Sequence, residues 1–514
     1  MRLSELVTGF QIVPAGADPE ITAITEDSRR VRPGALFVAV PGTLLDGHAY
    51  IADAVSRGAA AIVAERTGAI PPGVPVVRVP SSRAGLALLA ARFHRPAAST
   101  LSLVGFTGTF GKTSTSEILR ALLDASGART GVLGSLGARY RDFYDPGHGL
   151  TTPAPVELHR ALRGLEAAGA DTVILEVTSH ALTMNRVDGL RFDGGLLAAI
   201  MPGEHTDFHR TYEDYVEAKR GFLDHLKPAA LLAYDADNMA ARQVAECRGK
   251  PERDARRAEH RHHRRTAPVV AVDAAADESV PARNVGFSMD GRDADLQLYD
   301  IAVDGRGASF TVGGPLLGAR SGTRLHSPLL GRGHLRNVAL ALTYALGIGL
   351  PVSAAAAVVA ALTPLRRRME SYEVDGRRVL DDTAAHPNSF RGTFAVAASL
   401  PRRNLAVVYA VRGRRGVEIN RQNALAIADL CSIYGAEPLI VTSSADATNA
   451  ADAVQPAEIE ATRQALVSRG RRFVWHEMLA DALADALHRT AAGDLIVLVG
   501  AQGMNDAKTL LLHG

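Results

Sequence analysis

The sequence has little cysteine, little net charge and no long apolar run, and each shortage excludes a class of protein. Only two cysteines, Cys247 and Cys431, occur in 514 residues, so we expect neither a disulfide framework nor a cysteine-based zinc site. The 57 basic and 55 acidic residues leave a formal net charge of +2, which gives no reason to expect nucleic acid or an anionic membrane as a partner. Alanine-rich runs such as residues 354–361 are too short to span a bilayer, and the first residues lack the apolar core of a signal peptide. We therefore expect a cytoplasmic monomer that acts on small molecules.

The length and the alternation of short apolar runs with helical patterns predict an α/β protein of three domains. Residues 1–97 form the predicted N-terminal domain, residues 98–364 the central domain and residues 365–514 a Rossmann-like C-terminal domain. A run rich in arginine, histidine and glutamate, at about residues 251–266, has no aromatic residues and no apolar period. This composition favours a mobile, solvated insertion over a nucleic-acid-binding segment.

The strongest chemical signal is the stretch Leu101–Leu123. It begins with an apolar run typical of a buried parallel strand, continues with closely spaced glycines, and ends with apolar residues at helical spacing. In such a strand–loop–helix unit, loop amides and the helix N-terminus attract phosphate oxygens. Lys112 can then reach the terminal phosphates, and the Thr113 hydroxyl can hold Mg²⁺.

The spacing of this loop departs from the strict P-loop, because Phe106 stands where that pattern has its first glycine. A glycine-rich turn that caps the helix and binds nothing is the alternative. The strand before the loop and the helix after it favour a nucleotide site. The residues predicted around the nucleotide phosphates are Gly108, Thr109, Gly111, Lys112, Thr113 and Ser114.

Further polar residues follow the neighbouring strands. Glu176 ends a predicted strand at 172–177, and His205 follows another at 195–201. Since ligands collect beyond the carboxyl ends of parallel strands, Glu176 is well placed to bind a metal near the phosphates. Lys219 lies in a predicted helix, where a lysine is ordinarily solvated. Ser28 lies in a turn-rich loop, which suits either a cap or the recognition of a phosphorylated ligand.

Taken together, these motifs resemble a known family. They are Asp27-Ser-Arg, Pro41-Gly-Thr, Asp46-Gly-His, Thr107-Gly-Thr-Phe-Gly-Lys-Thr, Thr151-Thr-Pro, Glu176-Val-Thr-Ser-His-Ala-Leu, Arg186-Val-Asp-Gly, Glu213-Asp-Tyr with Ala218-Lys219, Arg368-Met-Glu, and Asp382 with Pro387-Asn-Ser. The sequence is similar nearly end to end to the Mur ligases of peptidoglycan synthesis, and most closely to the members that add the third amino acid of the stem peptide. The resemblance implies three domains, with a central P-loop-type parallel sheet and a Rossmann-like third domain.

The resemblance also implies a mechanism. ATP would phosphorylate the carboxylate of UDP-N-acetylmuramoyl-peptide or of a related acid, and an amine would displace the phosphate. Lys112, Glu176, His205 and Lys219 would be catalytic, with Thr113, Glu176, His205 and a carbamylated Lys219 as ligands of Mg²⁺. Asn337, Arg368 and Asp382 would bind the nucleotide, and Ser28, Thr151, Thr152, Ser179 and Arg186 would bind the UDP-muramoyl substrate.

The sequence departs from the family pattern at several positions. The family's asparagine in the phosphate loop is Phe110, an asparagine upstream of His205 is Ala199, and the substrate-side glutamine is Met184. The Asp-Asn-Pro-Arg signature that clamps a diamino acid is absent, and the closing Gly-Lys-Gly-His-Glu is Ala501-Gln-Gly-Met-Asn. These departures leave a second hypothesis open, namely a non-catalytic relative that binds nucleotide or UDP-sugar peptide as a regulator. A ligase of a specialised pathway is a further alternative.

The amine that would attack is therefore not fixed by the motifs. The free carboxylate of an amino acid needs a basic partner, and arginine is the usual one. The loop that begins at Arg412 follows a predicted strand, so Arg414 and Arg415, with Arg412 and Arg421, are the candidates for acceptor binding, and a solvated basic loop is the alternative.

Overall fold

The structure is a computed structural model that describes residues 1–13, 18–42, 45–66, 71, 73–94, 100–147, 149–203, 208–248, 282–318, 322–450 and 452–513. The chain divides into two compact units. Unit 1 comprises Met1–Gln297, Gly313–Ser321 and Ala339–Ala355, and unit 2 comprises Leu298–Val312, Gly322–Val338 and Ala356–Gly514. The predicted α/β class is confirmed, whereas the domain limits at residues 97 and 364 stay a prediction. The predicted basic insertion at 251–266 lies outside the described residues.

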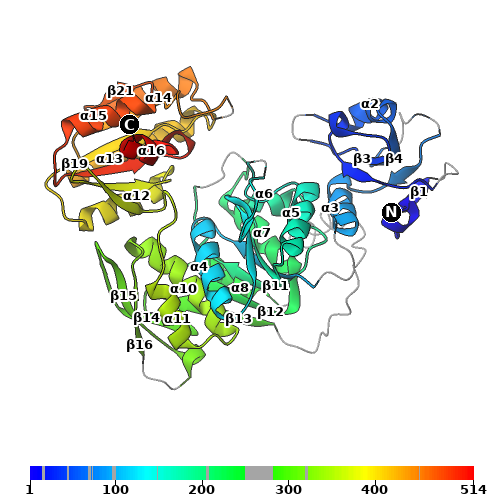
Figure 1. Cartoon of the computed structure of the whole chain (residues 1–514), viewed down its shortest axis with the longest axis horizontal. Helices are drawn as coiled ribbons and strands as arrows, with labels where there is room; N and C mark the ends of the chain where they lie inside the picture. Colours follow the sequence, from blue (N-terminus) through cyan, green and yellow to red (C-terminus); the bar gives the residue numbers. More distant parts are fainter. Residues whose placement is uncertain are drawn as a thin grey trace. The chain divides into compact units, whose positions relative to one another are not determined.

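Unit 1 begins with a five-stranded sheet in the order β1-β5-β4-β3-β2 (Figure 1). All its pairs are parallel except β1 with β5. Nearly every residue of β3 and β4 is buried, which explains why both read as continuous apolar runs. The elements are α1 (Leu3–Leu6), β1 (Gln11–Val13), β2 (Ala23–Thr25), β3 (Ala35–Val38), α2 (Ile51–Ser56), β4 (Ala59–Ala64), β5 (Val76–Arg78) and α3 (Ser82–His94).

The second sheet of unit 1 has β6 at its centre, paired in parallel with β10 on one side and β11 on the other. The strand order runs β13-β12-β11-β6-β10-β7-β8-β9, so the loops after β6, β10 and β11 open at neighbouring points on one edge. The elements are β6 (Ser102–Thr107), α4 (Lys112–Ala125), β7 (Thr130–Gly134), β8 (Gly137–Tyr140), β9 (Phe143–Asp145), α5 (Pro155–Ala167), β10 (Thr172–Glu176), α6 (Ser179–Thr183), β11 (Phe192–Leu197), α7 (Tyr212–Arg220), β12 (Leu226–Asp235), α8 (Met239–Glu246) and β13 (Arg283–Ser288).

The strand predicted at 195–201 ends at Leu197 in the structure, and this early end has a physical reason. The backbone beyond it turns to the phosphate loop, where Thr109 donates its amide to the Ala199 carbonyl at 2.9 Å. The Met201 amide in turn donates to the Thr109 hydroxyl at 2.9 Å. Residues 199–201 therefore support the loop after β6 instead of extending their own sheet.

Unit 2 holds a six-stranded sheet in the order β17-β18-β22-β19-β20-β21, parallel except for the edge strand β17. Helices α12, α13 and α14 contribute to a core on one face, and α15 and α16 to a core on the other, as expected of a doubly wound sheet. The elements are β17 (Glu370–Val374), β18 (Arg377–Asp382), α12 (Pro387–Ser399), β19 (Leu405–Ala410), α13 (Val417–Tyr434), β20 (Leu439–Thr442), α14 (Pro456–Ser468), β21 (Val474–His476), α15 (Leu479–Arg489), β22 (Leu495–Val499) and α16 (Ala507–His513).

The division between the units falls inside four elements, β14, β15, α10 and α11. Strands β15 and β16 pair antiparallel. The remaining elements are β14 (Leu296–Asp304), β15 (Gly307–Gly313), β16 (Thr323–Ser327), α10 (Gly331–Gly347) and α11 (Val352–Ala360).

Candidate functional site

The phosphate loop of unit 1 connects β6 to α4 and comprises residues 108–111. Gly111 is the N-cap of α4 with φ +79, a left-handed conformation that favours glycine, and α4 begins at Lys112. The first turn of α4 carries Thr113 and Ser114, both nearly buried. The predicted strand, loop and helix are thus all present, and the amides of this first turn are the groups that attract phosphate.

Two lysines converge on the carbonyl oxygen of Gly108. The Lys112 ammonium donates to it at 3.0 Å and to the Thr109 carbonyl at 3.2 Å. Lys219 comes from α7, and its ammonium donates to the same Gly108 oxygen at 2.9 Å. Only 1% of Lys219 is exposed, so its description as a solvated helix lysine is wrong. The reason is that α7 packs its Lys219 face against the phosphate loop, with the ammonium 4.8 Å from the centre of the Tyr215 ring.

Glu176 places a buried carboxylate beside the start of α4. It accepts hydrogen bonds from the hydroxyls of Thr113 and Ser135, each at 3.2 Å. A Cβ on Gly134 would lie 2.2 Å from the Glu176 carboxylate, so only glycine leaves room for it. The sequence predicted Glu176 and Thr113 but missed Ser135, whose only signal was its place directly after a strand.

These oxygens suit a hard cation such as Mg²⁺, which prefers carboxylate, hydroxyl, phosphate and water ligands. Within the described residues, no group of three or more histidine, cysteine, aspartate or glutamate side chains lies close enough to hold a metal ion. Thr113 and Glu176 therefore fit a site that a nucleotide's phosphate oxygens would complete. His205, the other predicted ligand, lies outside the described residues.

The predicted substrate residues surround the same strand end. The buried Thr152 hydroxyl donates to the Glu176 carbonyl at 2.9 Å, and the Thr151 hydroxyl lies 2.9 Å from that of Ser135. Arg186 donates to the Thr152 carbonyl at 3.0 Å. The remaining pair meets nearby, with the Ser179 hydroxyl 3.0 Å from Nε2 of His209.

Ser28, the substrate residue predicted in the first sheet's loops, lies at the start of a short 3-10 helix over residues 28–30 and is nearly buried. It hydrogen-bonds to the Asp53 carboxylate, which lowers the pKa of Asp53 after the larger effect of its Arg57 partner. The structure thus gives Ser28 a structural partner and does not test its predicted role.

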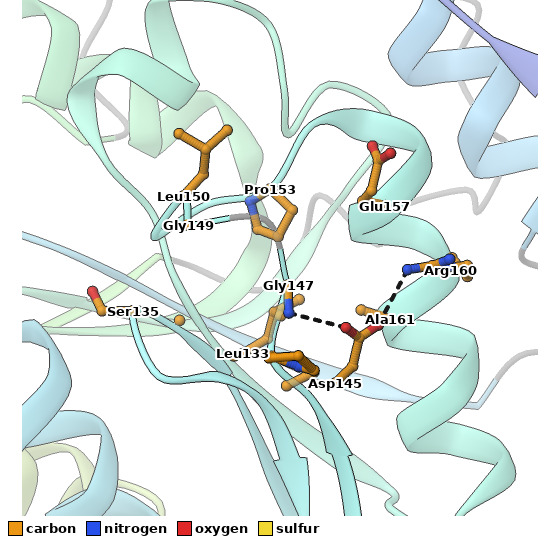
Figure 2. A pocket seen from close by; sticks show the side chains of 14 residues that line it. Leu133, Ser135, Asp145, Gly147, Gly149, Leu150, Pro153, Glu157, Arg160 and Ala161 are labelled. Carbon is orange, nitrogen blue, oxygen red and sulfur yellow. Dashed lines mark hydrogen bonds and ion pairs between the residues drawn. The ribbon is translucent and has the colours of Figure 1, made fainter. Parts of the chain in front are cut away.

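A small pocket, partly open to solvent, lies beside the Thr151-Thr152-Pro153 segment (Figure 2). Its wall is formed by the β8–β9 region and the start of α5. Asp145 orders this wall, because its carboxylate accepts from the Gly147 amide at 3.0 Å and from Arg160 at 3.4 Å. Ser135 also lines the pocket, so the pocket reaches a residue that contacts Glu176.

Unit 2 carries the other predicted nucleotide residues. Asp382 ends β18 and is buried, and its carboxylate accepts from the Thr393 hydroxyl at 2.6 Å. Burial raises the pKa of Asp382, whereas Thr393, Arg368 and His334 act to lower it. Arg368 donates to the Thr383 hydroxyl at 2.5 Å. Asn337 is half-buried on α10, one turn after the buried His334. All three predicted residues, Asn337, Arg368 and Asp382, therefore lie within unit 2.

The loop with Arg414 and Arg415 is held from inside unit 2. The carboxylate of Glu458, which is 2% exposed, accepts from the backbone amides of Arg414 at 3.0 Å, Arg415 at 2.8 Å and Gly416 at 2.7 Å. It also accepts from the Gln455 amide at 2.9 Å. Arg414 and Arg415 themselves are exposed to solvent, and binding of an acceptor by their side chains would require this exposure. Arg421 instead pairs with Glu418 on the surface of α13 at 2.7 Å. No pattern in the sequence pointed to Glu458.

In the described part of the chain, no helix is long and apolar enough to cross a membrane.

Three family models match the chain. They are described as "Mur ligase family, catalytic domain" over residues 20–94, "Mur ligase middle domain" over residues 106–266, and "Mur ligase, glutamate ligase domain" over residues 367–502.

Curated relatives match over nearly the whole chain. One is the UDP-N-acetylmuramoyl-L-alanyl-D-glutamate--2,6-diaminopimelate ligase of Chlorobaculum tepidum, 31% identical over 94% of this chain and 88% of its own length. Another is the UDP-N-acetylmuramyl-tripeptide synthetase of a Roseiflexus species, 31% identical over 94% of this chain and 90% of its own length. A solved structure of a UDP-N-acetylmuramoyl-L-alanyl-D-glutamate--2,6-diaminopimelate ligase covers 98% of this chain and 93% of its own chain, with a TM-score of 0.64 and 21% identity. That structural likeness concerns the fold.

Proposed function

This chain belongs to the Mur ligase family, and from that premise we propose that it is an ATP-dependent ligase that joins a carboxylate to an amino-acid amine. The observation that carries the proposal is the phosphate loop, where Lys112, Lys219 and the Thr113–Glu176 pair meet within one turn of α4. A helix that only capped a glycine-rich turn would not need a buried lysine and a buried glutamate at its N-terminus.

The reaction has two steps in this proposal. A carboxylate oxygen attacks the γ-phosphorus of ATP, ADP leaves, and an acyl phosphate forms. The amine nitrogen then attacks the acyl carbon, inorganic phosphate leaves with the electron pair, and the nitrogen loses a proton. Lys112 would neutralise charge on the transferred phosphoryl group, and the amides at the start of α4 would bind the neighbouring phosphates.

Mg²⁺ would be held by Thr113 and Glu176, and it would neutralise the charge of the phosphate oxygens. Ser135 would orient Glu176 through its hydroxyl. Glu176 ends β10 and accepts from the Thr113 hydroxyl in the first turn of α4. Its carboxylate would therefore meet the nucleotide phosphates at the N-terminus of α4.

Lys219 would carry a carbamate in the active protein. The two ammonium groups of Lys112 and Lys219 lie about 3 Å from one oxygen atom, so they lie within about 6 Å of each other and repel. Reaction of the Lys219 amine with carbon dioxide forms an N–C bond, releases a proton and leaves an anion at this position. The anion would attract Lys112 and offer oxygen ligands to a metal.

We further propose that the carboxylate belongs to a UDP-muramoyl dipeptide, the compound in the names of the relatives. Ser28, Thr151, Thr152, Ser179 and Arg186 would bind it. Arg414 and Arg415 would bind the carboxylate of the incoming amino acid, and Asn337, Arg368 and Asp382 would bind the nucleotide in unit 2. The predicted limits of the three domains, 1–97, 98–364 and 365–514, are part of this proposal.

The test is phosphate release from ATP by the full chain, supplied with Mg²⁺, UDP-N-acetylmuramoyl-L-alanyl-D-glutamate and pools of amino acids. We expect release only when carboxylate and amine are both present, together with a product whose mass equals their sum less one water. The matched control is Lys112→Ala, which should release phosphate about 10²–10³-fold more slowly. ADP binding without any release in every pool would contradict the ligase and favour the regulator.

A further inference from the structure

The residue directly before Arg368 has an unusual environment for a linker arginine. Arg367 stands in a run of three arginines that the sequence presents as a basic linker, yet only 2% of it is exposed. Its φ of +56 lies in the left-handed region, which a residue with a Cβ rarely adopts. A disfavoured backbone persists only where the surroundings hold it, so the question is what holds Arg367.

The guanidinium of Arg367 is the centre of a buried hub. Its Nε donates to the Asp381 carboxylate at 3.0 Å, and its Nη2 donates to the Gly500 carbonyl at 2.5 Å. Its Nη1 donates to the Ala501 carbonyl and to the Asn505 side-chain oxygen, each at 2.7 Å. Four acceptors shared among Nε, Nη1 and Nη2 suit the forked donors of a guanidinium and not the ammonium of a lysine.

The hub joins the ends of two neighbouring strands. Asp381 lies at the end of β18, and Gly500 follows the end of β22, which pairs with β18 up to Asp382 and Val499. The backbone adds a further tie, because the Thr383 amide donates to the Arg367 carbonyl at 2.9 Å. Asn505 and Ala501 belong to the closing segment, residues 501–505, whose sequence departs from the family pattern.

The residues after Arg367 are the predicted nucleotide contacts. Arg368 donates to the Thr383 hydroxyl, and the Met369 amide approaches the Asp382 carboxylate at 3.4 Å. The direction in which Arg368 leaves the backbone is set by the dihedral angles of the residue before it. We propose that Arg367 is a positioning residue for the nucleotide-binding edge of unit 2, because its buried guanidinium fixes the linker backbone that presents Arg368. The proposal rests on the nucleotide role given above to Arg368 and Asp382.

The experiment compares two arginines of the same strand region. Arg377 lies at the start of β18 and, like Arg367, ties it to a neighbouring segment, since it donates to the Leu487 carbonyl at 3.0 Å and the Thr490 carbonyl at 2.7 Å. It lies at the opposite end of β18 from Asp382. Arg367→Lys and Arg377→Lys therefore remove similar numbers of hydrogen bonds at opposite ends of one strand. The probe is Mg²⁺·ADP, with its dissociation constant measured by calorimetry and thermal unfolding recorded for each full-length variant.

We expect both lysine variants to unfold at lower temperature, and Arg367→Lys alone to bind ADP about tenfold more weakly. Asn505→Ala removes one acceptor of the hub and should weaken ADP binding about threefold, which keeps the test usable if Arg367→Lys does not fold. Equal ADP affinities in Arg367→Lys and Arg377→Lys would overturn the proposal and leave Arg367 a structural residue only.

Arg368→Ala separates this proposal from the proposed function. Weaker ADP binding in Arg368→Ala with normal binding in Arg367→Lys would overturn the hub's positioning role alone. Unchanged binding in Arg368→Ala would overturn the nucleotide role of this edge and the hub proposal with it. An unmodified chain that does not bind ADP would contradict the proposed function itself.

Discussion

In the phosphate loop of unit 1, charged side chains from two helices converge on the carbonyl of one glycine, whereas at the carboxyl edge of unit 2 the polar side chains hold one another. Lys112 and Lys219 both reach Gly108. In unit 2, the Arg367 guanidinium donates to the closing segment, and the Glu458 carboxylate accepts from several backbone amides. The phosphate loop keeps most of the residues of the family pattern, with Phe110 as the exception, whereas the closing segment of unit 2 departs from that pattern. This difference supports the proposal that activation of a carboxylate is kept while recognition of the amine differs from that of the family.

The largest effect is expected when the lysine of the phosphate loop is removed, because this tests whether the loop of unit 1 activates a carboxylate. Lys112→Ala should lower phosphate release by about 10²–10³-fold, because charge on the transferred phosphoryl group would lose its partner. The thermal midpoint should change little, since the Lys112 side chain is only half-buried. Lys227→Ala is the matched control, a surface lysine of unit 1 that pairs with Asp193. Near-normal phosphate release by Lys112→Ala would contradict the proposal that this loop binds the nucleotide.

Lys219 gives the second prediction. Lys219→Arg keeps a cation but cannot form a carbamate, so activity should fall about 10²-fold if a carbamate binds metal. Lys219→Ala should be inactive as well, and added formate should restore part of its activity by supplying the missing carboxylate. Full activity in Lys219→Arg would show that an unmodified cation at this position is sufficient for activity.

The rebuilt edge of unit 2 is probed by the choice of amine. The distal end of a diamino acid would need polar partners in the closing segment, yet Met504 is fully buried and the Asn505 oxygen already accepts from Arg367. We expect kcat/KM for meso-diaminopimelate to be at least about tenfold below that of a smaller amine. Steady-state assays over an amino-acid panel measure this. Diaminopimelate as the best acceptor by a wide margin would contradict the prediction.

The smallest expected effect concerns the loop that carries Arg414 and Arg415. Glu458→Gln replaces a carboxylate oxygen by an amide that cannot accept from the loop, at a cost of about 1 kcal/mol. Amide hydrogen exchange at residues 414–416 should therefore quicken about fivefold. Glu460→Gln is the control on the same helix, because Glu460 is exposed and its carboxylate accepts from the Gln464 side chain. Equal exchange in both variants would show that Glu458 does not hold the loop.

The sequence was most informative where function depends on neighbours along the chain. The strand, loop and helix around Lys112 follow from one stretch, and the place of Glu176 at a strand end follows from the next. The α/β class is confirmed for the same reason, because strands and helices alternate with clear periods.

The sequence was least informative where contacts join distant segments. Arg367 looks like part of a solvated basic run, yet it is buried, and three of its four acceptors lie 133 to 138 residues later. Lys219 was ordinary by local pattern alone, and its burial depends on a loop 111 residues earlier. Glu458 similarly meets its amide donors only through the packing of α14 beside α13.

The amide ring around Glu458 has a kinetic consequence. A loop whose amides are already satisfied by the protein's own carboxylate has its backbone shape before any ligand arrives, so binding an amino acid should not require the loop to order first. Association of the acceptor should then follow a single exponential in rapid-mixing experiments, with a rate proportional to its concentration and no slower phase that saturates.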